Sequence, residues 1–345
     1  MTALRVLWRI AGALLALGAL TALVVTGSPT TSAASLTVFG PPHELSKVTL
    51  SDFSIDGPAL WTSPTGPIRA ELGWVGGGRD TAHHINLMTS GDGVHWGDKI
   101  TLNDTSASRP GLTRYSAATN DNVVVAWTGT DANHSLNVLV GNPPLGFTKM
   151  TLKYDNSFTS PAVAMLHGDV YLVWAGTDAG KTLNVAQIIP RGGLMVGSHT
   201  TLWGWSSIAR PSVVYDPNGQ QLLMSWTSTD QRIHFATSKD GMHWTQPASS
   251  PLAEWSDVGP AMFSAATNNM PRYFVTWRGT NAAHSVNVRY TESFPSWPSD
   301  NAKGILPETA FGGPAIGYVG VYRQVIVAWA GTDTLHHLNI AVVGM

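Results

Sequence analysis

The chain has 345 residues, of which 43% are hydrophobic and 12% charged, and its formal net charge is −2. This composition predicts a large buried core and argues against intrinsic disorder. The near-neutral charge without a basic tract argues against nucleic acid as a partner, and the absence of cysteine excludes a disulfide framework and a thiol nucleophile.

The first 34 residues have the pattern of a secretory signal peptide. Arg5 and Arg9 precede an apolar run over residues 10–25, and Ser32 and Ala34 suit the −3 and −1 positions of a cleavage site. The run is shorter than the roughly 20 residues of a comfortable membrane span, and an uncleaved membrane anchor is the alternative. We therefore expect a leader at 1–34, a linker at 35–43 and a folded domain at 44–345. The protein would be secreted or held at the cell surface, touching a membrane only through an uncleaved leader.

Two markers alternate along the rest of the chain with a period near 50 residues. The first is a tryptophan at the end of an apolar segment, at Trp74, Trp127, Trp174, Trp226, Trp277 and Trp329. The second is a proline followed by a small and then an aliphatic residue, at Pro58, Pro110, Pro161, Pro211, Pro260 and Pro314. A fixed period in this range indicates a solenoid, a propeller or an array.

Each repeat has the pattern of four short antiparallel strands. A short apolar strand follows the proline, and after a turn comes a second strand, such as residues 122–127 or 221–226. These second strands are apolar at both alternating positions, which is typical of a strand that is buried on both faces. A loop after the tryptophan leads to a third strand and then a fourth. Four strands per repeat predict the blade of a β-propeller.

The two ends of the chain indicate how the ring closes. The sixth repeat ends after its third strand, whereas residues 47–53 resemble the fourth strands at 99–104 and 149–155. The sequence therefore predicts an all-β, six-bladed propeller in which the N-terminal strand completes the last blade. This closure removes free sheet edges without disulfides.

The loop after each tryptophan repeats a Gly-Thr-Asp-x-x-His motif. Its acidic position is filled by Asp80, Asp131, Asp178, Asp230 and Asp333, with Asn281 in the fifth repeat. Asparagine can fill a hydrogen-bonding role in a turn but cannot replace a catalytic carboxylate, so the motif primarily predicts a turn. Each Asp–His pair stands alone, which argues against a metal site, and no cofactor is expected.

Residues 89–96 and 237–244 share Ser or Thr, Asp, Gly and a Trp three residues after the Gly. They resemble the Asp-box of sialidases and related six-bladed propellers, in a variant spacing with Asp92 and Asp240 directly before the Gly. The resemblance implies a sialidase-like propeller with these turns on the face opposite a sialidase active site. It is not a clear match to a catalytic sialidase.

A sialidase-like site would need three arginines, a tyrosine nucleophile with a glutamate partner, and an acid/base aspartate. Arg109 and Arg210 directly precede marker prolines and are expected to reach the central face, but no third arginine has this position. Tyr115 is a candidate nucleophile without an identifiable partner. Other glycosidases need only a carboxylate pair, for which Asp56 and Asp257 are the candidates.

A binding module needs less, because sugars are recognised by aromatic faces and planar polar side chains. The residues expected to bind such a ligand on the central face are Asp131, His134, Trp205, Trp255, His284 and His336. Several linked weak sites of this kind would add avidity. The sequence favours an exported carbohydrate-binding propeller whose partner is a glycan or polysaccharide. A secreted exo-glycosidase, sialidase-like or arabinosidase-like, is the alternative, and a cell-surface protein-interaction propeller is the second alternative.

Overall fold

The computed structural model describes residues 40–63, 68–117, 120–142, 146–191, 193–267, 270–297, 302–320 and 323–345. All of them belong to one compact unit, Phe39–Met345. The predicted leader and most of the predicted linker lie outside the described residues. In the part of the chain that is described, no helix is long and apolar enough to span a membrane.

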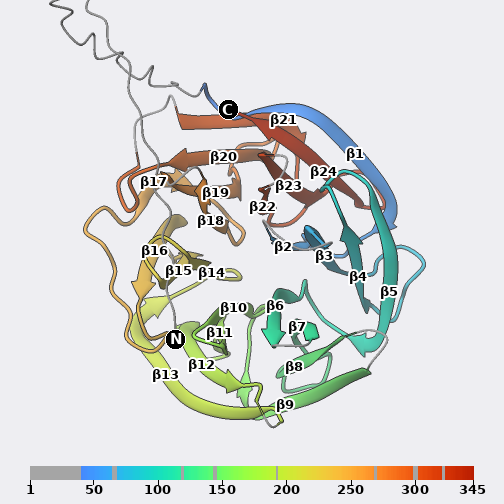
Figure 1. The fold of residues 1–345 in the computed structure, drawn as a ribbon, viewed down its shortest axis with the longest axis vertical. Coiled ribbons are helices and arrows are strands. Elements are labelled where there is room, and N and C mark those ends of the chain that lie inside the picture. The colour runs from blue at the N-terminus through green and yellow to red at the C-terminus, as the bar shows by residue number, and fades with distance from the viewer. Residues whose placement is uncertain are drawn as a thin grey trace, which may run out of the picture. The chain divides into compact units, whose positions relative to one another are not determined.

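Six four-stranded antiparallel sheets are arranged in a ring, as Figure 1 shows, which confirms the predicted fold class and blade number. Blades 1 and 2 consist of β2 (Ala59–Thr62), β3 (Ala70–Val75), β4 (His84–Ser90), β5 (Trp96–Thr105), β6 (Gly111–Ala117), β7 (Asn120–Thr128), β8 (Ser135–Asn142) and β9 (Gly146–Asn156). Blades 3 and 4 consist of β10 (Ala162–Leu166), β11 (Asp169–Ala175), β12 (Thr182–Ile189), β13 (Met195–Ser206), β14 (Ser212–Asp216), β15 (Gln221–Thr227), β16 (Arg232–Ser238) and β17 (Leu252–Trp255). Blades 5 and 6 consist of β18 (Ala261–Thr267), β19 (Met270–Arg278), β20 (Ser285–Thr291), β21 (Lys303–Thr309), β22 (Ala315–Val319), β23 (Gln324–Ala330), β24 (His337–Gly344) and β1 (His43–Phe53).

The ring closes through the N-terminal strand. β1 pairs antiparallel with β24, with Val48 opposite Ile340 and Thr49 opposite Asn339, and the strand order in blade 6 is β1-β24-β23-β22. Figure 1 shows β1 lying along β24 at the rim of the ring. The predicted closure is confirmed, and it leaves the outer strand of blade 6 paired in the same way as the outer strands of the other blades.

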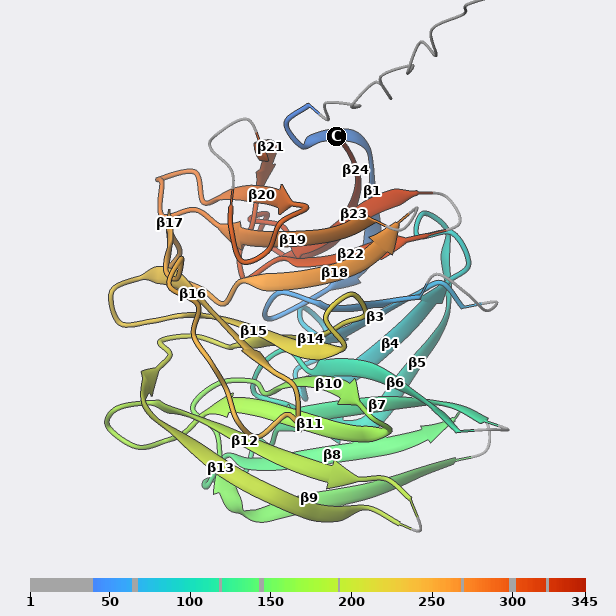
Figure 2. The same ribbon diagram turned by 60° about the vertical axis from the view of Figure 1, so that its left-hand side comes forward.

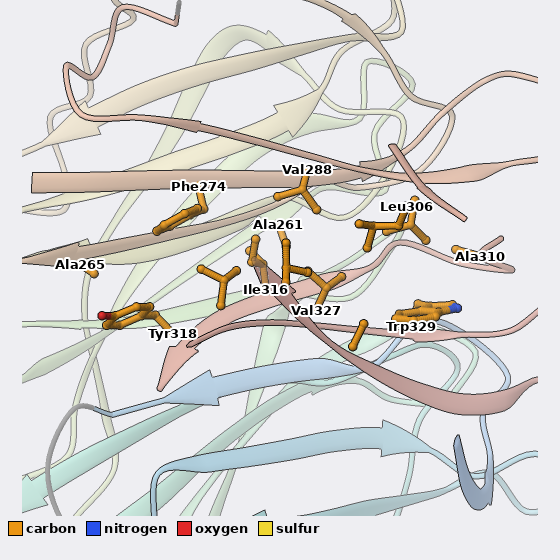
Figure 3. Close-up of a cluster of buried hydrophobic side chains, with 14 residues drawn as sticks. Ala261, Ala265, Phe274, Val288, Leu306, Ala310, Ile316, Tyr318, Val327 and Trp329 are labelled. Carbon is orange, nitrogen blue, oxygen red and sulfur yellow. The ribbon is translucent and has the colours of Figure 1, made fainter. Parts of the chain in front are cut away.

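The hydrophobic core lies between neighbouring blades, which pack face to face around the ring (Figure 2). The six marker tryptophans stand on the second strands and are at most 2% exposed. Figure 3 shows one such layer, in which Phe274 and Val288 of blade 5 face Val327 and Trp329 of blade 6. Because each second strand is covered by a blade on both sides, apolar residues occupy both of its alternating faces.

The up-and-down course of the strands gives the ring two distinct faces. We call "loop face" the one that carries the connections from fourth to first strands and from second to third strands. We call "turn face" the opposite one, which carries the connections from first to second and from third to fourth strands. The repeated Gly-Thr-Asp-x-x-His loops and the residues before the marker prolines therefore share the loop face.

Candidate functional site

The repeated aspartates cap the loops in which they stand. Asp131 accepts hydrogen bonds from the backbone N–H of Asn133 (3.1 Å) and of Ser135 (3.2 Å), and Asn281 accepts one from the N–H of Ser285 (3.0 Å). Partial burial raises the pKa of Asp131, but hydrogen bonds from Ser135 and Asn133 outweigh it and leave the pKa below its usual value. The turn role predicted for the motif is therefore observed at this position and at the Asn281 copy.

The histidines of the motif occupy a left-handed backbone position. His134, His284 and His336 have φ values of 54°, 52° and 57°. His336 stacks on Phe311 with ring centroids 3.7 Å apart, and its Nδ1 lies 2.9 Å from the carbonyl oxygen of Gly331. These histidines stand in equivalent loops of three different blades, so the structure does not bring them together.

Trp205 and Trp255, which were expected on the central face, lie on the outer strands β13 and β17. Trp205 stacks on Trp226 of the next blade, with centroids 5.2 Å apart and planes 13° apart, so it belongs to the packing between blades. Trp255 is 51% exposed, with the Arg232 guanidinium 5.8 Å from its ring centroid. Of these two predicted ligand-binding tryptophans, Trp255 is the one that presents its ring to solvent.

A buried serine that the sequence analysis did not single out fixes the loops from fourth to first strands. Ser106 donates to the carbonyl oxygens of Ser108 (2.6 Å) and Thr128 (3.1 Å). Four other loops carry a buried serine at this position: Ser54, Ser157, Ser207 and Ser256. The loops are thereby held inward, toward the axis of the ring.

The inward course of these loops buries Arg109 and leaves Arg210 half-buried. Arg109 is 2% exposed and its Nη1 donates to the carbonyl oxygens of Gly313 (2.5 Å) and Pro58 (3.3 Å). Arg210 donates from Nε to the carbonyl oxygen of Pro161 (3.2 Å) and from Nη2 to that of Pro110 (3.5 Å). Both guanidinium groups thus lie inside the ring and donate to main-chain oxygens. The sequence analysis had instead predicted that they would reach the open central face.

Of the other predicted catalytic residues, Asp56 lies beside Arg109, whereas Asp257 and Tyr115 have other partners. Asp56 accepts from the N–H of Gly57 (2.6 Å) and of Arg109 (3.2 Å), whereas Asp257 is held by Arg278 at 2.6 and 2.9 Å. Among the described residues, no hydrogen bond or ion pair links the two aspartates. Tyr115 packs between blades 2 and 3 and is about 20 Å along the chain from Arg109.

An open groove lies instead between blades 6 and 1, with a volume of about 330 Å³. Its lining residues are Ser51, Asp52, Phe53, Trp74, Gly76, Gly77, Arg79, Asp80, His84, Asn86, Lys99 and Thr101. We call this the 6–1 groove.

The polar side chains of the 6–1 groove are arranged as two charged pairs and one free cation. Asp80 contacts His84, with Oδ1 and Nδ1 2.9 Å apart. Partial burial raises the pKa of Asp80, but hydrogen bonds from His84 outweigh it and leave the pKa below its usual value. Lys99 is ion-paired with Asp52. Arg79 is exposed, and within the described residues its side chain has no hydrogen-bond or ion-pair partner.

A longer loop and two substitutions open this groove. Trp74 and Asp80 are six residues apart, whereas the corresponding residues of the other repeats are four apart, and Arg79 stands where the other repeats have Thr. In the groove between blades 1 and 2, the hydroxyl oxygens of Thr105 and Thr130 are 3.1 Å apart and bridge the blades. Phe53 replaces the first of these threonines in the 6–1 groove. The sequence analysis missed the site because it compared what the repeats share; the longer spacing was the available signal.

Comparisons with known proteins identify the fold. No family model matches the sequence, and no curated protein matches it either. A sialidase mutant of Trypanosoma rangeli that displays trans-sialidase activity matches at 11% identity and TM-score 0.56, over 89% of this chain and 58% of that one. The BP39L lectin of Burkholderia pseudomallei matches at 14% identity and TM-score 0.60 over 83% and 81% of the two chains. The fucose-specific lectin of Aleuria aurantia matches at 14% identity and TM-score 0.60, over 86% of this chain and 98% of that one.

The chain has the sialidase-like six-bladed propeller fold. It spans little more than half the length of the Trypanosoma chain, and at these identities the likeness concerns the fold alone. In this sialidase-like propeller, no group of three or more His, Asp or Glu side chains that could hold a metal ion occurs among the described residues.

Two turns of the sialidase-like propeller share one hydrogen-bond pattern. Ser90 accepts from the N–H of Gly93 (2.8 Å), and Asp92 accepts from the N–H groups of Val94 (2.8 Å) and His95 (2.7 Å). Residues 238–243 repeat these bonds. Both turns connect third to fourth strands, on the turn face, so they are remote from the loop face. Their identity as Asp-boxes stays a prediction.

Proposed function

We propose that this protein is an exported carbohydrate-binding propeller and that the 6–1 groove is its glycan site. The observation that carries the proposal is the free guanidinium of Arg79 beside the Asp80–His84 pair in an open groove. A volume of about 330 Å³ lies within the range of small-ligand pockets. Planar polar groups of this kind hydrogen-bond sugar hydroxyls, and Phe53 supplies aromatic surface in the same groove.

The contacts of the candidate acids favour binding over catalysis. A glycosidase pair requires two carboxyl groups about 5–9.5 Å apart that face one substrate. Asp56 is engaged by two backbone N–H groups and Asp257 by both ends of the Arg278 guanidinium. Both carboxylates already have hydrogen-bond partners, which favours a role in holding the loops over a role in sugar hydrolysis. Two of the similar structures are named as lectins, which supports the same choice. Export rests on the leader pattern at 1–34.

The proposal is tested by a glycan array read in parallel with a panel of chromogenic glycosides that includes sialosides and arabinosides. We expect binding to a defined subset of glycans and no release of chromophore. A protein that binds no glycan on the array would refute the proposal. Turnover that Asp56→Asn or Asp257→Asn abolishes would instead establish the exo-glycosidase.

A further inference from the structure

A second cavity, of about 730 Å³, lies on the axis of the ring. The first strands of all six blades contribute to its wall, so it is separate from the 6–1 groove at the rim. The wall is mainly apolar along its length, with Leu60, Val163, Met262, Phe263 and Ile316. Sequence analysis placed the site of this propeller at the loop face and gave no indication of this chamber.

Among the residues that the structure describes, the cavity is closed at the loop face and open at the turn face. At the loop face, the backbones of Gly57, Gly259 and Gly313 are so close that a Cβ atom at Gly57 would clash with the carbonyl oxygen of Gly313. At the other end, Tyr215 is 42% exposed and Arg323 is exposed, and both line the cavity. Five residues separate Arg210 at the closed end from Tyr215 at the mouth, a depth of about 16 Å.

The closed end carries more positive than negative charge. The Arg210 guanidinium belongs to the wall, and its hydrogen bonds go to the main-chain oxygens of Pro110 and Pro161. Burial lowers the pKa of Arg210 well below its usual value, neighbouring Arg109 lowers it further, and Asp56 partly offsets both. Two guanidinium groups against one carboxylate leave one positive charge uncompensated in a buried place, which is unfavourable.

The structure also shows an unused donor at this end and a balanced cation elsewhere. Arg109 is not part of the cavity lining, but its Nη2 is buried and has no hydrogen-bond partner among the described residues. By contrast, Arg114, farther along the wall, is ion-paired with Glu71 at 2.7 Å. At the closed end an anion would therefore be stabilised in a buried place, whereas Arg323 stands in solvent at the mouth.

We propose that the axial cavity binds an amphipathic monocarboxylate that enters from the turn face, with its carboxylate on Arg210 and its apolar body along the wall. Guanidinium and carboxylate form short, charge-assisted hydrogen bonds in a fixed geometry. An aliphatic or aryl body matches the mainly apolar wall better than the hydroxyl-rich body of a sugar acid would. The site is independent of the 6–1 groove and of glycan binding.

The test is isothermal titration calorimetry on the full chain with decanoate, decanol and N-acetylneuraminate. We expect one decanoate per chain, bound at least tenfold more tightly than decanol, which has the same apolar body without the charge. N-acetylneuraminate should not displace decanoate. Equal affinity for decanoate and decanol, no decanoate binding, or displacement by N-acetylneuraminate would each overturn the proposal.

A pair of variants locates the site. Arg210→Met removes the charge at similar volume, and we expect at least a tenfold loss of decanoate affinity with decanol affinity within threefold. The matched control is Arg191→Met, on an exposed arginine that is ion-paired with Asp169, which should change neither. A folded Arg210→Met protein with unchanged decanoate affinity would refute the assignment. If that variant does not fold, the comparison of decanoate with decanol on the wild-type chain decides alone.

Discussion

The 6–1 groove and the groove between blades 1 and 2 share one framework. In both, a lysine of the outer strand lies over a buried tryptophan, Lys99 at 5.2 Å from Trp74 and Lys149 at 5.1 Å from Trp127. Each lysine is also ion-paired with an aspartate on the outer strand of the preceding blade. Both grooves therefore have the same floor, the buried tryptophan, and the same outer wall, the lysine–aspartate pair.

The two grooves differ at their rim. Thr105 and Thr130 bridge the blades in one, whereas Phe53 and Arg79 stand apart in the other, on a loop two residues longer. Repetition supplies the scaffold, and the proposed glycan site lies where one repeat departs from the others. Predictions about the two grooves should therefore agree for the floor and disagree for the rim.

The largest effect is expected at the shared floor. Trp74→Ala and Trp127→Ala should each lower the free energy of unfolding by about 3–5 kcal/mol, because each removes a buried indole from between two blades. Urea denaturation of the two variants measures this. A loss below about 1 kcal/mol at Trp74 alone would show that the floor of the 6–1 groove is not part of the core.

A smaller effect is expected where the rim is closed. Thr105→Val removes the hydrogen bond to Thr130 and should lower the free energy of unfolding by about 0.5–1 kcal/mol. Thr309→Val should do the same, because Thr309 and Thr332 are 2.7 Å apart in the groove between blades 5 and 6. Differential scanning calorimetry of both variants checks this, and stability equal to wild type in both would contradict a bridging role.

The smallest effect is expected at a repeated carboxylate. Asp131→Asn should change the free energy of unfolding by less than about 0.5 kcal/mol at pH 7, because Asn281 already fills this role in blade 5. The folded-state pKa of Asp131 is lowered, so its contribution is present above the usual aspartate pKa and lost as the pH falls through the folded-state pKa. The variant should therefore lose slightly less stability than wild type between pH 7 and pH 3. Urea denaturation at the two pH values measures the difference, and a large loss at pH 7 would mean that the charge itself is needed.

The ring could be predicted from the sequence because its evidence is repeated six times. The tryptophan spacing fixed the number of blades, and the likeness of residues 47–53 to later fourth strands identified the closing strand. The hydrogen-bonding role of Asp131 was predictable for the same reason. Asn281 fills the same position in the fifth repeat, which indicates that hydrogen bonding, and not negative charge, is the property needed there.

The sites were harder to predict because they depend on distances between blades. Whether Arg109 and Arg210 reach solvent depends on how closely the loops meet at the axis, and the sequence does not encode that gap locally. The stacking of Trp205 on Trp226 likewise joins two blades. The 6–1 groove was within reach of the sequence, through the two-residue extension before Asp80, but only by comparing where the repeats differ.

The most direct test of the account is calorimetric titration of the tightest glycan from the array into wild type, Arg79→Thr and Thr130→Ala. Arg79→Thr restores the residue of the other repeats, and Thr130→Ala is the matched change in a closed groove. The account predicts one site per chain, at least a tenfold weaker affinity for Arg79→Thr at unchanged melting temperature, and affinity within twofold of wild type for Thr130→Ala. An Arg79→Thr variant that binds as tightly as wild type would contradict it.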